Sequence, residues 1–119
     1  MKIEKWSVYH ANLDPVIGSE QGKSRPVLVI SENDINELLN IINIIPITSR
    51  KPGRVIYPNE AVLLPGKTGL KNESVVLCHQ IRTIDKRRIS GLYGVIPEEE
   101  KQAEILDAIC FQLGIERKK

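Results

Sequence analysis

Cysteine, histidine and aromatic residues are scarce in this chain of 119 residues. The two cysteines and two histidines show no Cys-x-x-Cys or His-x-x-x-His spacing, so the chain is poorly supplied for a zinc site. Cys78 and Cys110 both lie in apolar segments and are expected to be free, buried thiols. Aromatic residues make up 4% of the sequence, which leaves few rings for stacking on nucleobases. We therefore expect no metal ion and no cofactor.

Long hydrophobic runs are also missing. No run approaches the length of a membrane span, and the first residues, Met-Lys-Ile-Glu-Lys-Trp, contain no apolar segment typical of a signal peptide. We therefore expect a cytoplasmic protein that does not enter a membrane. The remaining composition, 41% hydrophobic and 27% charged, is ordinary for a globular protein, and the length predicts a single domain over residues 1–119.

Positive and negative charges nearly balance, at a net +2, but the basic residues are unevenly distributed. If they share one face of the fold, they create a groove that attracts phosphate groups. If they do not, they are ordinary solvated surface charges, and the sequence leaves both interpretations open. The three basic clusters, each beside a predicted strand, are Lys23 and Arg25; Arg50, Lys51 and Arg54; and Arg82, Lys86, Arg87 and Arg88.

Apolar segments of strand length follow one another through most of the chain. They predict strands at residues 6–11, 25–30, 41–48, 54–57, 74–79 with a continuation to 85, and 93–95. In one of these strands Ile42 and Ile44 lie on one face and Ile45 and Ile47 on the other, so both faces need apolar cover. We expect a mostly antiparallel sheet of five or more strands that curls into a small barrel.

A short helix is expected between two of the strands. Ser31, with Asp34 three residues later, predicts a capping box and a helix over residues 34–39.

A longer helix is expected near the C-terminal end. Pro97 and the three glutamates after it suit the start of a helix, and Gly114 suits its end. The predicted fold class is α+β, mainly β, with this helix packed on the barrel. Its apolar stripe consists of Leu106, Ile109 and Leu113, flanked by Ile105 and Cys110.

The connection 12–24 is long for a small domain, which is typical of functional loops. Gly18 and Gly22 permit positive φ and close backbone approach, so we interpret the loop as a lid or wall beside a binding surface. Arg25 stands where this loop meets a buried strand, and its side chain is either aimed at a ligand or engaged in a surface ion pair. Thr48 emerges where another strand ends, a position that an ordinary strand-forming residue can also occupy.

Six short segments occur in order between residue 6 and about residue 95: Val8-Tyr9, Ala11-Asn-Leu-Asp-Pro15, Gly18-Ser-Glu-Gln21, Arg25-Pro-Val-Leu-Val29, Pro46-Ile-Thr-Ser49 and Gln80-Ile-Arg-Thr-Ile-Asp85. Together they resemble the MazF/PemK toxins of bacterial toxin-antitoxin systems. The resemblance implies an SH3-like barrel that forms a homodimer. It also implies ribosome-independent, metal-independent cleavage of single-stranded RNA at short preferred sequences. The implied partner is a cognate antitoxin whose acidic, disordered tail occupies the RNA groove.

Carried over by position, the catalytic pair of the family falls on Arg25 and Thr48, with Glu20 of the loop beside them. The chain departs from many relatives after Gly22, where Lys23-Ser24 stands in place of a glycine and adds charge and stiffness to the loop. The residues expected to bind RNA are Gln21, Gly22, Lys23, Ser49, Arg50, Gln80 and Arg82.

Side chains of these types can promote attack of an RNA 2′-OH on the neighbouring phosphate, which leaves 2′,3′-cyclic phosphate and 5′-OH ends. Arg25 suits neutralisation of the phosphate, and Thr48 can donate a hydrogen bond to it or position the 2′-OH. A guanidine with a pKa above about 12 is a poor base, so Glu20 is the candidate general base. His79 is the alternative base, although its apolar neighbours favour a structural role, as those of His10 do.

Two other functions fit the same resemblance. The CcdB toxins share the barrel and the dimer but poison gyrase without cutting RNA, and Arg25 and Thr48 would then be structural. The segments around Arg25 and Thr48 argue against that alternative. A barrel that binds RNA without cleaving it is the third possibility.

Overall fold

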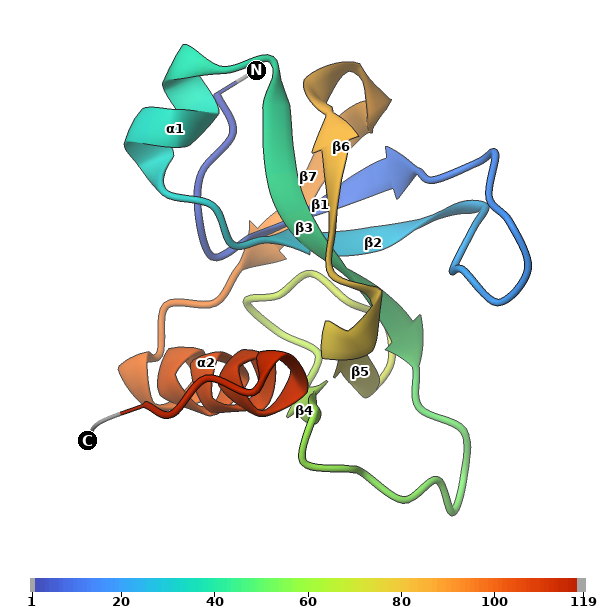
Figure 1. The fold of residues 1–119 in the computed structure, drawn as a ribbon. Helices are drawn as coiled ribbons and strands as arrows, with labels where there is room; N and C mark the ends of the chain where they lie inside the picture. The colour runs from blue at the N-terminus through green and yellow to red at the C-terminus, as the bar shows by residue number, and fades with distance from the viewer. Residues whose placement is uncertain (1, 118–119) are drawn as a thin grey trace.

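The computed structural model describes residues 2–117, which form an antiparallel β-fold with two α-helices (Figure 1). The strands are β1 Ser7–Asn12, β2 Ser24–Val29, β3 Ile41–Ser49, β4 Glu60–Leu63, β5 Ser74–Leu77, β6 Arg82–Asp85 and β7 Ile89–Val95. The helices are α1 Asn33–Leu38 and α2 Glu99–Leu113, and two short 3-10 turns, η1 and η2, span Cys78–Gln80 and Lys86–Arg88.

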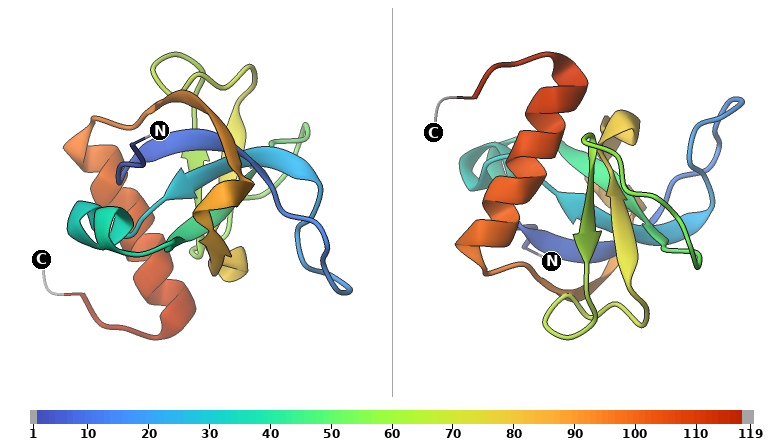
Figure 2. Two further views of the ribbon diagram at one scale, coloured as in Figure 1. Left: turned by 90° about the horizontal axis from the view of Figure 1, so that it is seen from above. Right: turned by 90° about the horizontal axis from the view of Figure 1, so that it is seen from below.

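The strands of the described residues form a seven-stranded sheet in the order β4-β5-β3-β2-β1-β7, with β6 paired to β3. Every pairing is antiparallel. β3 is the centre of the fold, because it pairs with β6, β2 and β5 in turn along its length. Helix α2 packs on the side of β4, while the β1–β2 loop projects away from α2 (Figures 1 and 2). The predicted antiparallel β-fold with a C-terminal helix is confirmed.

The two faces of β3 serve two separate cores. Ile45 and Ile47 pack with residues of β4, β5 and α2 in the first core. Ile42 and Ile44 pack with residues of β1, β2 and β6 in the second core. All four isoleucines are at most 1% exposed, so the predicted need for cover on both faces is confirmed.

Helix α2 ends as predicted, at Gly114 with its left-handed φ of 69°, but its buried face differs from the predicted stripe. The fully buried positions are Ile105, Ala108 and Ile109, whereas Leu113 is 52% exposed. Of the predicted stripe, Ile105 and Ile109 are buried and Leu106 packs against the first core, so the prediction fails mainly at Leu113.

The predicted strand at residues 54–57 is wrong, because this segment is an irregular connection and the strand follows at β4. Its polar groups turn toward Glu60, which accepts hydrogen bonds from the Arg54 guanidinium and, at 3.0 Å, from the backbone N of Tyr57. The predicted strand 74–79 stops at Leu77, where the β4–β5 pairing ends at Glu60. His79 therefore lies exposed in η1 rather than in a buried strand.

The short helix is present as α1, but the predicted capping box is wrong. Glu32 occupies the N-cap position and makes no side-chain cap hydrogen bond. Ser31 is buried beneath the helix, where its hydroxyl donates to Asn36 Oδ1 and accepts from the backbone N of Asn43. Ser31 therefore connects α1 to β3 instead of capping the helix.

Candidate active site

Arg25 and Thr48 extend one face of the sheet beyond its core. The β2–β3 pairing ends at Val27 opposite Pro46, so Arg25 and Thr48 each lie two residues beyond the last pair, on the same faces of their strands as Val27 and Pro46. Opposed residues of an antiparallel pair point to the same side. Here that side carries the second core, to which Val27 belongs. β3 then leaves β2 to pair with β5, so the two side chains flank the point where the strands diverge.

Arg82 brings a second guanidinium to this face. It is paired with Ile44 across the β3–β6 ladder, and Ile44 belongs to the second core. Partial burial and the nearby charge of Arg82 lower the pKa of Arg25, while Asp14 acts in the opposite direction. Within residues 2–117 neither Arg25 nor Arg82 forms an ion pair with a carboxylate. Two like charges held together without a direct ion-pair partner are typical of an anion-binding site.

The guanidinium of Arg25 uses one of its nitrogens internally. Its Nε donates a hydrogen bond to the backbone oxygen of Gly22 at 2.7 Å. Its two terminal nitrogens make no hydrogen bond to any other described residue. The fork of the guanidinium is thus free to bind an oxyanion with both terminal nitrogens.

The β1–β2 loop is fastened to η1 and β6 by Gln80 and Arg82. The Gln80 Oε1 atom accepts from the backbone N of Gln21 at 3.1 Å and from Arg82 Nη2 at 2.9 Å. Gln80 Nε2 donates to Ser19 O at 3.3 Å, and Arg82 Nη1 donates to Gln21 O at 2.9 Å. These contacts bring together the loop and the basic segment, as the interpretation of the loop as a wall requires.

Glu20 shares an open hollow with residues of η1 and β6. The hollow has a volume of about 350 Å³ and is lined by Ser19, Glu20, His79, Gln80, Ile81 and Arg82. Glu20 Oε1 accepts a hydrogen bond from the backbone N of Ile17 at 2.6 Å, which leaves its other oxygen available. His79 lines the same hollow, so both candidate bases stand on the side of Arg82.

Thr48 and Ser49 line a different hollow, of about 250 Å³, between the end of β3 and the β4–β5 connection. The structure adds Lys71, Asn72 and Tyr93 to this wall, three residues that the sequence analysis did not single out. Their signal in the sequence is a glycine, Gly69, whose φ of 72° and close contact with the Tyr93 backbone exclude any side chain.

Arg50 differs from Arg82 because its guanidinium is paired with a carboxylate. Nη1 lies 2.9 Å from Glu73 Oε2, and Nε and Nη2 donate to Arg54 O at 3.2 and 2.8 Å. Arg54 itself is paired with Glu60, and Arg87 is paired with Asp85. The basic clusters therefore do not contribute equally to a groove, and the middle cluster is largely neutralised.

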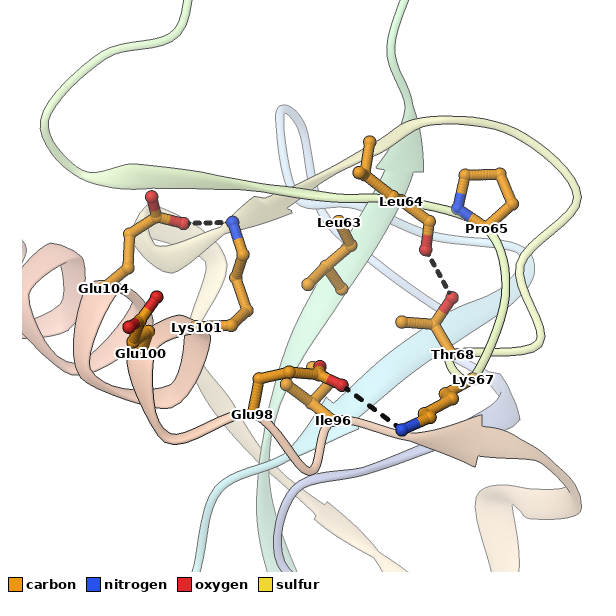
Figure 3. Close-up of a pocket in the computed structure, with 10 residues that line it drawn as sticks. All are labelled: Leu63, Leu64, Pro65, Lys67, Thr68, Ile96, Glu98, Glu100, Lys101 and Glu104. Atoms are coloured by element: carbon orange, nitrogen blue, oxygen red, sulfur yellow. Dashed lines mark hydrogen bonds and ion pairs between the residues drawn. The ribbon is translucent and has the colours of Figure 1, made fainter.

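A further hollow lies elsewhere, between the β4–β5 connection and the start of α2 (Figure 3). Its volume is about 560 Å³, and its floor includes Leu63 and Ile96. The two lysines at its rim are paired with glutamates, Lys67 with Glu98 at 4.0 Å and Lys101 with Glu104 (Figure 3). Its glutamates outnumber its lysines, so it does not suit a polyanion.

Two further properties concern residues 2–117 as a whole. None of their helices combines the length and the apolar character needed to cross a membrane. In this part of the chain, no three side chains of His, Cys, Asp or Glu gather into a potential metal site.

Comparison with known proteins identifies the family. Residues 4–113 match the family described as PemK-like, MazF-like toxin of type II toxin-antitoxin system. Endoribonuclease EndoA of Bacillus subtilis (strain 168) is 39% identical over 115 residues, which is 97% of each chain. The structure of MazF (Form-I) from Deinococcus radiodurans is 30% identical, covers 97% of this chain and 99% of its own, and gives a TM-score of 0.78.

A mycobacterial endoribonuclease solved in complex with its cognate antitoxin has the same fold, with a TM-score of 0.78 over 98% of this chain and 99% of its own. At 19% identity, that likeness concerns the fold alone. The family match and the full-length relative go further, because each spans nearly the whole chain. The chain belongs to the MazF/PemK family of toxins of type II toxin-antitoxin systems.

Proposed function

We propose that this toxin, an endoribonuclease like its 39% identical relative, cleaves single-stranded mRNA in the cytoplasm without a metal ion and thereby stops translation and growth. One observation carries the proposal. Partial burial and the positive charge of Arg82 lower the pKa of Arg25, and neither guanidinium forms an ion pair with a carboxylate within residues 2–117. A phosphodiester can supply the direct ion-pair partner that both guanidinium groups lack.

The proposed reaction is attack of an RNA 2′-oxygen on the adjacent phosphorus. Glu20 accepts the proton of the 2′-OH, the bond from phosphorus to the 5′-oxygen breaks, and that oxygen takes up a proton from the solvent. The terminal nitrogens of Arg25 stabilise the charge that builds up on the phosphate oxygens. Thr48 donates a hydrogen bond to the same phosphate. The products have 2′,3′-cyclic phosphate and 5′-OH ends.

RNA binding is assigned to both sides of the catalytic pair. Gln80 and Arg82 hold the loop and line its hollow, so bases or phosphates of the strand can reach them there. Ser49 is exposed at the other hollow. Gln21, Gly22 and Lys23 contribute from the loop. The sequence predicts Arg50 as a further contact, but because Glu73 already neutralises its guanidinium, we propose that it contributes little to RNA binding.

The proposed partners are a cognate antitoxin and a second copy of the chain. A MazE-MazF complex of Deinococcus radiodurans, whose structure is 30% identical to this chain, supports an antitoxin partner. We propose that its acidic tail lies along Arg25 and Arg82, where RNA binds. Large apolar side chains supply surface for a homodimer, namely Tyr57, Phe111, Leu113 and Ile115, each more than half exposed in the single chain.

An assay in EDTA tests the proposal. Purified protein is incubated with single-stranded RNA, and the new ends are analysed for cyclic phosphate and 5′-OH groups. Arg25→Ala and Thr48→Ala are each expected to lower the cleavage rate by about 10²-fold or more, with unchanged circular dichroism. Cleavage that requires added metal contradicts the proposal. Intact RNA contradicts it as well, with arrested gyrase indicating a CcdB-like poison and RNA binding indicating a non-catalytic barrel.

A further inference from the structure

The side chain of Asp14 links the two ends of the β1–β2 loop. Asp14 Oδ1 accepts a hydrogen bond from the backbone N of Lys23 at 2.7 Å. Beside it, the backbone N of Leu13 donates to Lys23 O at 2.9 Å. The two ends of the loop that carries Glu20 and Gln21 are thus fastened together immediately before β2 begins at Ser24.

The bond from Asp14 continues through a single peptide group to Arg25. The N–H that Asp14 accepts belongs to Lys23, and the C=O of the same peptide group belongs to Gly22. That C=O accepts the Nε–H of Arg25 at 2.7 Å. Because a peptide group is planar, fixing its N–H also fixes the direction of its C=O. The orientation of the Arg25 guanidinium therefore depends on Asp14.

The surroundings of this peptide group fit that dependence. A Cβ on Gly22 would lie 2.5 Å from Asp14 Oδ1 and 2.8 Å from Val16 Cγ2, so only glycine allows the carboxylate to come so close. Lys23 adopts a φ of 63°, a left-handed conformation that is uncommon for a residue with a side chain. The bond to Asp14 helps to hold it there.

A second anchor fixes Asp14 itself. Arg88 Nη1 donates to the backbone oxygens of Asn12 and Asp14, which ties the start of the loop to η2. The backbone N of Asp14 donates to Asn12 Oδ1 at 3.0 Å. Asp14 is therefore held from the side of β1 while it holds the peptide group on the side of β2.

The charges of Asp14 and Arg25 also suit the dipole of the peptide group that lies between them. The carboxylate faces the N–H end of the peptide dipole, and the guanidinium faces its C=O end, so each bond strengthens the other. The negative charge of Asp14 offsets part of the repulsion between Arg25 and Arg82. It does so without contacting the two terminal nitrogens of Arg25, which stay available for the substrate.

We propose that Asp14 is a positioning residue for the reaction: through the peptide group between Gly22 and Lys23, it sets the plane of the Arg25 guanidinium and presents both terminal nitrogens to the phosphate. The catalytic consequence rests on the proposed function. The orientation of Arg25 does not, and can be measured without RNA.

The kinetic test compares Asp14→Ala with Asp14→Asn. Alanine removes the acceptor, so the guanidinium loses its orientation and kcat is expected to fall by about 10²-fold with KM within about twofold. Asparagine keeps an oxygen at the same place and is expected to restore kcat to within about tenfold of the wild type. Asp34→Ala, which removes an exposed acid of α1 far along the chain, is the matched control and is expected to leave both constants unchanged.

The direct test follows the Nε–H of Arg25 by nitrogen-15 NMR of arginine side chains. The wild type and Asp14→Asn are expected to show slow exchange of this proton with water, and Asp14→Ala fast exchange. Unchanged exchange or unchanged kcat in Asp14→Ala overturns the proposal. If that variant does not fold, Asp14→Glu displaces the oxygen by one methylene while keeping its charge, and a wild-type kcat then overturns it. A wild-type protein that cleaves no RNA contradicts the proposed function instead, and the exchange measurement still decides the role of Asp14.

Discussion

Two pairs of arginines lie beside strands of this fold: Arg50 with Arg54, and Arg25 with Arg82. The pairs differ in the charge of the groups that face them. Arg54 binds the buried carboxylate of Glu60 through two hydrogen bonds, of 3.0 and 2.6 Å, and this contact raises the pKa of Arg54. Arg25 faces Arg82, and its pKa is lowered by burial and by that second positive charge. The sequence shows basic clusters in both places, but only the carboxylates distinguish a structural cluster from one able to bind phosphate.

The sharpest way to test this difference is the same conservative substitution in each pair. Arg25→Lys keeps the charge but loses the fork and the Nε–H that Gly22 accepts, so kcat is expected to fall by about 10²-fold. Arg50→Lys, where Glu73 already neutralises the side chain, is expected to change kcat by less than about threefold. Cleavage rates of one RNA by both variants check the prediction. Equal losses would mean that the middle cluster also acts on the phosphate.

The free energy of unfolding is expected to depend more on Arg54 than on Arg25. Arg54→Ala leaves Glu60, 7% exposed, without its counter-charge, and should lower the free energy of unfolding by about 2 kcal/mol. Arg25→Ala removes a like-charge contact with Arg82 and is expected to leave the free energy of unfolding unchanged or slightly higher. Urea unfolding of the two variants decides this. A larger loss for Arg25→Ala would show that its role is structural.

Low pH is expected to remove the stabilising effect of the Arg54–Glu60 pair. The hydrogen bonds from Arg54, partly opposed by burial, lower the pKa of Glu60 below its ordinary value of 4.5. The unfolded chain thus takes up the proton first, so this contribution to stability is complete above pH 4.5 and disappears as the pH falls through the lowered pKa. In Glu60→Gln, we expect a shallower loss of stability over that acid range. Parallel curves for the variant and the wild type would show that Glu60 is not the titrating group.

The smallest expected effect is on the salt dependence of RNA binding, measured with Arg25→Ala as the non-cleaving background. Removing a phosphate contact should reduce the slope of log K against log salt by about 0.7, and we expect this for Arg82→Gln. Arg50→Gln is expected to leave the slope unchanged, because Glu73 already occupies that guanidinium. Equal slopes for the two variants would indicate that both clusters contact the RNA backbone.

The alternation of isoleucines in β3 and the stop at Gly114 were predictable because they depend on neighbours in the sequence. The side chains that neutralise Arg50 and Arg54 were not, because Glu73 is 23 residues from Arg50 and an irregular connection separates Arg54 from Glu60. That connection was itself mistaken for a strand.

Within the candidate site, Arg25 and Thr48 could be selected from the sequence, but their surroundings could not. The bond from Gln80 to the loop joins residues 59 apart, and such pairings appear only when strands adopt their register. The same holds for the shared face of Arg25 and Arg82, which follows from the pairing of β3 with both β2 and β6.

The central position of β3 has a consequence for how each of the two proposed catalytic groups, Thr48 and Arg25, can be disturbed. The strand that ends in Thr48 and Ser49 is built into both cores, so its amides are expected to exchange with solvent only when the whole domain unfolds. The backbone that carries the Thr48 hydroxyl is therefore expected to stay in place as long as the domain is folded. Arg25, by contrast, is aimed by a surface loop. A partner that displaces only this loop can silence the toxin and leave every element of its architecture in place.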